Sequence, residues 1–228
     1  MTDNISDKST ADLLGKLGRG GKVAFRYEME NCLLARWRRE IDLDHLVDLL
    51  RSRSSSDRLR GAYYLGELGQ AVEGLKTPAL LLADDSLSDC RRAFVSFIWN
   101  SCFYDPAIAN ALAKCLLDLD LYVRLTTIRW AIRASEEIFA DFSRLVGSGA
   151  GQRKPNFRNP LSNDFWNAAN QKRAVRGLEI ARRVREGDKP GQIKEDLSEE
   201  DSFVFDGILF SMTTRERYSK RRKIKSHD

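Results

Sequence analysis

Apolar side chains recur at helical spacing through the middle of the chain. Between residues 119 and 133, leucines and isoleucines follow one another at steps of four, three and four: Leu121, Leu125, Ile128 and Ile132. These steps match one face of a helix of 3.6 residues per turn, and strand alternation does not fit them. The pattern therefore predicts an amphipathic helix here.

Two earlier segments, starting near residues 55 and 87, align with this one without gaps. Their shared arginines, Arg60, Arg92 and Arg124, lie 32 residues apart. A second apolar stretch follows each segment, at 72–83, 106–117 and 136–146. We therefore expect a repeat of two helices, preceded by a degenerate helix pair at 27–51 that is broken near residues 41–42. Residues suited to helix starts support this assignment: Asp57, Ser88 and Asp120 as N-caps, and Pro106 in a first turn.

Three features of this repeat resemble the HEAT and HEAT-like family of helical repeats. They are an acidic helix start, an apolar residue followed by arginine, as in Leu59-Arg60 and Val123-Arg124, and a helix of small and apolar residues at 61–69. The resemblance covers residues 27–146 and implies an all-α, right-handed α-solenoid whose second helices line a concave surface. The middle copy departs from the pattern, because Arg91 stands where the family has an apolar residue.

The chain outside the repeats divides into four further parts. Residues 1–26 form an N-terminal arm with a short helix, and 147–163 form a loop rich in glycine and proline. Residues 164–214 form C-terminal helices that cap the solenoid, with an acidic N-terminal cap at 198–201 before the last one. Residues with apolar side chains supply the buried face of the first of these helices: Phe165, Trp166, Ala169, Val175, Leu178, Ala181 and Val184. A basic stripe of Lys172, Arg176 and Arg183 lies on its other side, and 215–228 form a basic tail.

The net charge of +5 is concentrated in the last third of the chain. Residues 1–150 hold 20 basic and 21 acidic side chains, whereas residues 151–228 hold 18 and 12. The repeats are therefore near neutral. The basic tail has three interpretations: it grips phosphates, it docks an acidic protein, or it is a solvated end.

The chain has little material for catalysis or metal binding. It contains only two histidines, His45 and His227, and no closely spaced pair of cysteine or histidine ligands, so we expect no metal and no cofactor. The glycines of residues 15–22 lack the spacing of a phosphate-binding loop, and we expect a turn there. The four cysteines, Cys32, Cys90, Cys102 and Cys115, are expected to be reduced and to fill space between helices. A polar amino terminus without a long apolar run leads us to expect a cytoplasmic location.

These observations favour a non-catalytic protein that binds another macromolecule, with no catalytic residues. Small HEAT-like proteins of bacterial type include toxin-neutralising immunity proteins, which this chain resembles in size. The expected partner is then a protein, with nucleic acid as a second possibility through the basic end, and no membrane. The expected partner-binding residues are the acidic turn Asp84 and Asp85, the helix-surface arginines Arg129 and Arg133, and the basic stripe of Lys172, Arg176 and Arg183.

An enzyme acting on nucleic acid is the alternative. HEAT-like alkylpurine DNA glycosylases are similar in length, and the resemblance would place a carboxylate, Asp118 or Asp120, among tryptophans at 99, 130 and 166. The catalytic motif of that family does not map onto these positions, and a near-neutral solenoid is a poor cradle for DNA. A third alternative is an adaptor or lyase-type chaperone that holds a protein together with its cofactor.

Overall fold

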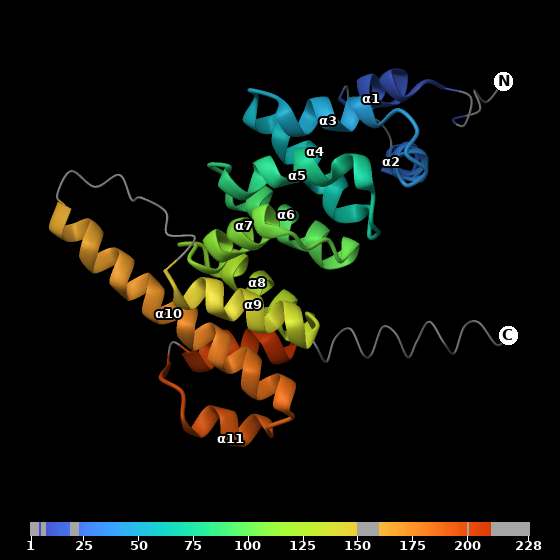
Figure 1. Ribbon diagram of the computed structural model, residues 1–228. Coiled ribbons are helices and arrows are strands. Elements are labelled where there is room, and N and C mark those ends of the chain that lie inside the picture. The colour runs from blue at the N-terminus through green and yellow to red at the C-terminus, as the bar shows by residue number, and fades with distance from the viewer. Residues whose placement is uncertain (1–4, 6–7, 19–22, 150–159, 200, 211–228) are drawn as a thin grey trace, which may run out of the picture. The chain divides into compact units, whose positions relative to one another are not determined.

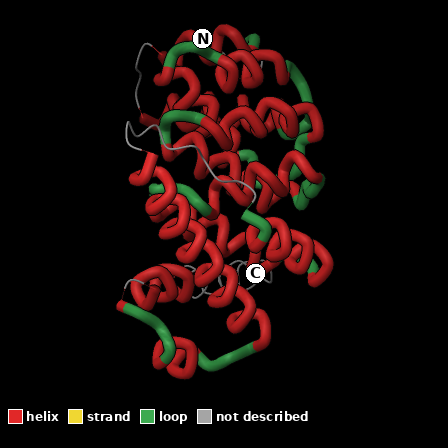
Figure 2. The backbone as a smooth tube through the Cα atoms, turned by 60° about the vertical axis from the view of Figure 1, so that its left-hand side comes forward, coloured by secondary structure: helices red, strands yellow, loops and turns green. Residues whose placement is uncertain are grey.

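The computed structural model describes residues 5, 8–18, 23–149, 160–199 and 201–210. All regular structure in these ranges is helical, without a strand, as Figure 2 shows. This confirms the expected all-α class for the described part of the chain. Two compact units make up the protein, residues 1–108 and 109–228, and the division falls inside α7.

The first unit consists of helices joined by short connections (Figure 1). They are α1 (Thr10–Gly18), α2 (Val23–Trp37), α3 (Leu43–Arg51), α4 (Ser55–Glu67), the 3-10 turn η2 (Glu73–Leu75), α5 (Lys76–Leu81), the 3-10 turn η3 (Leu82–Asp84), α6 (Ser88–Ser101) and the start of α7 (Pro106–Leu116). The expected break between α2 and α3 is confirmed, because Glu40 and Asp42 adopt left-handed backbone angles there.

The second unit begins with the rest of α7 and ends with the described C-terminal helices (Figure 1). It contains α8 (Leu121–Arg133), α9 (Glu136–Gly147), α10 (Pro160–Glu186), α11 (Pro190–Glu195) and a further helix over residues 201–210. The C-terminal helix restarts at Pro160 rather than at 163–164, and α11 was not expected from the sequence.

The structural repeat has a period of 33 residues rather than the expected 32. The first helices α4, α6 and α8 begin at Ser55, Ser88 and Leu121, each 33 residues after the last. A buried aromatic ring occupies the same position in all three helices, from Tyr64, Phe97 and Trp130. The equivalent arginines are therefore Arg58, Arg91 and Arg124, and Arg60 and Arg92 belong to other positions.

These three arginines each fasten the loop that precedes their helix. The guanidinium Nη1 donates to the carbonyl six residues earlier: Arg58 to Ser52 at 3.0 Å, Arg91 to Asp85 at 2.8 Å, and Arg124 to Asp118 at 2.7 Å. The side chain of that earlier residue in turn accepts the N–H two residues later: Ser52 from Ser54, Asp85 from Leu87, and Asp118 from Asp120. Arg91, which departs from the family pattern in the 32-residue alignment, is therefore the equivalent of Arg58 and Arg124 in the 33-residue repeat.

Of the three expected N-caps, only Asp120 is confirmed. Its side chain accepts the N–H groups of Tyr122 and Val123 at the start of α8. In α4 the cap is Ser54, which accepts from the N–H of Asp57, and α6 has Leu87 at the cap position with no side-chain bond. The second helices at α7 and α9 agree with expectation, with Pro106 opening α7, whereas 72–83 is divided into two 3-10 turns around the short α5.

Close helix packing in the first unit depends on Gly61. A Cβ at this position would lie 3.1 Å from side-chain and backbone atoms of α3, at Leu49 and Leu50, so a larger residue would press on α3 and force these atoms to shift. One turn further, the ring of Tyr64 packs edge-on against Trp37 of α2, with centroids 5.1 Å apart. The core of this unit therefore joins α2, α3 and α4.

In the second unit, α8 is the central helix. Its Trp130 packs edge-on against Phe142 of α9 at 5.0 Å, and α10 approaches it at Gly177, where a Cβ would lie 2.9 Å from Ile128. The helix over 201–210 also meets α8, because Arg129 donates to the carbonyl of Gly207 at 2.7 Å. How the successive helix pairs stack, and with it the right-handed solenoid, remains a prediction.

Several expectations for the C-terminal third differ from the structure or lie outside the described residues. Val175 was placed on the buried face of α10 but is 49% exposed, whereas Leu178 and Ala181 are buried as expected. The side chains at 165 and 166, the glycines at 20 and 21, and the basic tail at 215–228 lie outside the part of the chain whose side chains are described.

Candidate functional site

An open groove of about 370 Å³ runs between α4 and α6 in the first unit. We call it the α4–α6 groove. Its lining falls at helical spacing on both helices: Leu59, Ala62, Tyr63, Gly66 and Glu67 from α4, and Asp89, Arg92, Ala93 and Ser96 from α6. Four of these residues are small, and a Cβ built at Gly66 meets no atom within 4 Å. The groove exists because short side chains face one another across two packed helices.

Large side chains stand at its rim. Tyr63 is 51% exposed and Leu59 37% exposed, although both belong to a helix whose other face is core. Arg92 forms an exposed ion pair with Asp89 at 2.9 Å. Tyrosine and arginine are enriched at the energetic centres of protein interfaces.

The rim has a negative electrostatic character around Tyr63. Burial raises the pKa of the Tyr63 hydroxyl above its usual value, and the carboxylates of Glu30 and Glu67 raise it further, with Arg26 opposing. Glu30 is paired with Arg26 at 3.2 Å. Within the described residues, Glu67 forms no ion pair.

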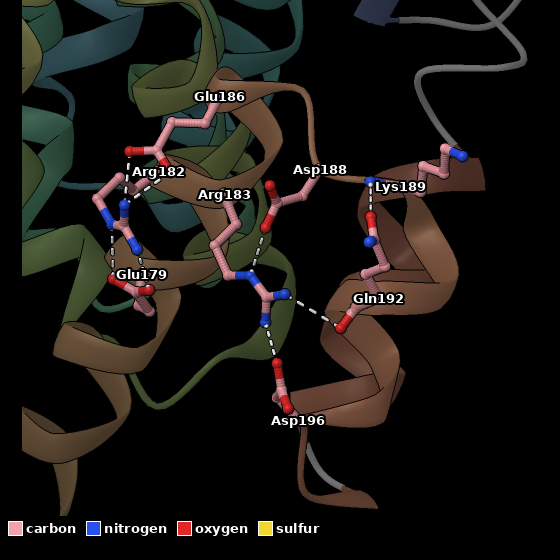
Figure 3. A network of polar contacts seen from close by, with 8 residues as sticks. All are labelled: Glu179, Arg182, Arg183, Glu186, Asp188, Lys189, Gln192 and Asp196. Carbon is pink, nitrogen blue, oxygen red and sulfur yellow. Dashed lines mark hydrogen bonds and ion pairs between the residues drawn. The ribbon is translucent and has the colours of Figure 1, made fainter.

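A second groove, of about 340 Å³, lies in the second unit between α10 and residues 196–201, which follow α11. Its charged residues are mostly paired within the chain. Arg183 binds Asp188 and Asp196 at 2.8 Å each and donates to the carbonyl of Gln192, so it ties α10 to α11 (Figure 3). The same figure shows Arg182 held between two glutamates of its own helix, Glu179 and Glu186. The hydrogen bond from Arg182 lowers the pKa of Glu179.

The sequence-predicted basic stripe is therefore interrupted in the structure. Arg176 pairs with Asp201 at 3.1 Å, and Arg183 is 16% exposed within the network just described. Lys172 is exposed on α10. Two of the three cations are therefore paired within the second unit, and the role of all three in binding stays a prediction.

The other predicted partner residues also divide into structural and exposed positions. Asp85 is 5% exposed at its side chain and forms a two-pronged pair with Arg58, in which Nε lies 2.5 Å from Oδ2. Its neighbour Asp84 is exposed at the end of η3. Arg129 is half-buried against Gly207, and Arg133 is exposed at the end of α8. Their role in binding stays a prediction.

The residues considered for a DNA glycosylase make contacts that stabilise the loop before α8, the start of α8 and the core. Asp118 is 1% exposed and holds the loop before α8, and Asp120 caps that helix. Trp130 is packed in the core against Phe142. Within the described residues, no group of three or more His, Cys, Asp or Glu side chains is arranged to hold a metal ion.

The cysteines form no disulfide in the described residues. Cys90 and Cys115 are buried as expected, but the expectation is wrong for Cys102, which is exposed in a left-handed turn after α6. Burial, followed by the charge of Asp85, raises the pKa of the Cys90 thiol to about 11.

The α4–α6 groove was not predicted from the sequence. The sequence features that form the groove are the small residues Ala62 and Gly66, at helical spacing, and the neighbouring Tyr63, which is exposed rather than part of the core. The expected period of 32 residues aligned α6 with α4 one position away from the register of the structure, so the residues that line the groove were not matched to one another.

Comparison with protein-family models, with curated proteins and with solved structures finds no match for this chain. Among the described residues, no helix has both the length and the apolar character needed to cross a bilayer. A functional proposal therefore depends on the geometry of the chain itself.

Proposed function

We propose that this is a non-catalytic protein-binding protein, built as a HEAT-like helical solenoid and working inside the cytoplasm. The observation that carries the proposal is the α4–α6 groove. Its lining residues Tyr63 and Leu59 are exposed to solvent, whereas the equivalent aromatic rings of the repeat are buried. Helical repeats build extended surfaces of this kind from successive similar units. An exposed aromatic rim over small residues suits a protein partner.

The arrangement of the remaining charged residues supports the same proposal. Asp118 and Asp120 are the two carboxylates considered for a glycosylase. The side chain of Asp118 accepts the N–H of Asp120 and its carbonyl accepts from Arg124, while Asp120 caps α8. A carboxylate that stabilises a cationic sugar must face the substrate. Binding of a protein makes no such demand, so the observed contacts favour it over the enzyme alternative.

A toxin-neutralising immunity protein is the specific form of this proposal that the sequence analysis raised. In that case the partner is a toxin domain, and the chain acts by covering it. Co-expression tests this form directly: the chain should restore growth to cells that produce the partner's toxic domain, and failure to restore it would leave only the general binding role.

Affinity capture with the tagged full chain from its native host tests the general proposal. We expect one identified protein that binds the purified chain directly and at fixed stoichiometry. Binding to DNA that falls steeply with salt, together with release of a base from alkylated DNA, would instead support the glycosylase alternative and contradict the proposal.

A further inference from the structure

The α4–α6 groove has the geometry of a site for a third helix. Its lining residues on α4 fall at 59, 62, 63 and 66, and those on α6 at 89, 92, 93 and 96, which is one continuous face of each helix. Two such helix faces, with small residues between them, can form a furrow into which the side chains of another helix fit. The open space at Gly66 supports this geometry, since a Cβ built there meets no atom within 4 Å.

The charged residues around this furrow favour a positive charge on the partner's binding segment. Glu67 brings a carboxylate that no described residue pairs, and Glu30 lies close enough to influence Tyr63. Among the described residues that line the groove, the one cation is Arg92, which is paired with Asp89. A lysine or arginine entering beside Tyr63 would meet the ring face and the Glu67 carboxylate together, whereas a nucleic-acid phosphate would be repelled.

We propose that the α4–α6 groove binds an amphipathic helix of a protein partner, which places apolar side chains over Ala62, Gly66 and Ala93 and a lysine or arginine against Tyr63 and Glu67. This inference rests on the proposed function and adds to it the shape and charge of the partner's binding segment.

Selection of helical peptides on the full-length chain tests the inference without knowledge of the natural partner. The probe is a displayed library of amphipathic helices about 20 residues long, above the roughly 12–15 at which isolated helices are marginal, with its charged positions randomised. We expect enrichment of peptides with an apolar i, i+4, i+7 stripe and a lysine or arginine beside it. Enrichment of acidic peptides, or no enrichment, would overturn the inference.

Two glycine variants locate the binding. Gly66→Leu fills the groove, whereas Gly15→Leu, the matched control, adds the same side chain to another helical glycine whose Cβ also has open space around it. We expect the affinity of enriched peptides to fall about thirtyfold or more in Gly66→Leu, as for an interface centre, and to be unchanged in Gly15→Leu. Equal affinity for both variants would place the peptides elsewhere and overturn the inference.

The charge is tested by reversal. In Glu67→Lys, peptides carrying lysine should lose affinity and peptides with glutamate at the same position should gain it. A loss for both kinds of peptide, or for neither, would show that Glu67 does not select the partner's charge.

The native partner separates this inference from the proposed function. If purified partner binds wild type, Gly66→Leu and Gly15→Leu equally, the protein-binding function stands and the groove inference is wrong. If the wild-type chain captures no protein at all, the proposed function fails, while the peptide selection still decides whether the groove accepts a helix.

Discussion

The pair formed by Arg58 and Asp85 offers the sharpest test of how the repeats are held together. We consider Asp85→Asn, because asparagine has nearly the same shape and keeps one oxygen for the N–H of Leu87. It loses the charge that receives both prongs of the Arg58 guanidinium, at 2.5 and 3.4 Å. The control is Asp89→Asn, an identical change one turn away, at a carboxylate that is 61% exposed.

The expected cost follows from the burial of Asp85. A hydrogen bond to a charged group contributes about 1.5–3 kcal/mol, and breaking a fully buried ion pair costs about 3–5 kcal/mol. Asp85 is 5% exposed but its partner keeps other hydrogen bonds, so we expect a loss of about 2–3 kcal/mol. At roughly 2–4 °C per kcal/mol, Tm should fall by roughly 4–12 °C. The control should lose less than about 1 kcal/mol.

Urea unfolding followed by circular dichroism at several pH values measures the loss of unfolding free energy, and thermal unfolding measures the fall in Tm. Burial acts to raise the pKa of Asp85, but the hydrogen bonds from Arg58 and the N–H of Leu87 outweigh it, so the folded-state pKa lies below the usual 3.8. The stabilisation is therefore complete above the unfolded pKa and is lost as pH falls through the folded one. The difference between wild type and Asp85→Asn should shrink below about pH 4. Equal stability of the two asparagine variants at neutral pH would refute the reasoning.

Three further predictions concern packing and titration. Gly61→Ala should lower the free energy of unfolding by about 1–3 kcal/mol because its Cβ would press on the adjacent helix. Gly66→Ala in the same helix should raise it by about 0.4–1 kcal/mol. Urea unfolding compares the two variants, and equal effects would contradict the packing. A thiol reagent at neutral pH should modify Cys102 before Cys90, whose pKa is raised to about 11; mass mapping that finds Cys90 modified first would be inconsistent with its burial. Burial raises the pKa of Tyr64 to about 12, so its contribution to stability should be present below pH 10 and fall between about pH 10 and 12; an identical alkaline decline in Tyr64→Phe would show otherwise.

The helices themselves were predictable because their signal is local. The apolar spacing in 121–133 and the turn residues at 41–42 and 106 each depend on a few neighbouring side chains. The N-caps and the repeat period were harder to predict, because they depend on which of several similar neighbouring residues makes the contact. Arg58 and Arg60 are chemically identical in sequence, and only the folded loop shows that Arg58 turns back to the Ser52 carbonyl.

The candidate site was harder to predict because it depends on two helices that are far apart in the sequence. Ala62 and Ala93 have no reason to face each other until α4 and α6 are packed in the register of 33 residues. Charged residues misled the site prediction for a related reason. Arg176 and Arg183 have the spacing of an exposed stripe, but aspartates that follow later in the chain occupy both of them.

Hydrogen exchange on the complex of the full chain with its captured partner shows whether the partner covers the α4–α6 groove. We expect amides near the rim of this groove, in residues 55–67 and 88–101, to become more protected on binding, and Gly66→Leu to abolish this protection together with the binding. Protection confined to residues 160–210, with Gly66→Leu binding as tightly as wild type, would contradict it.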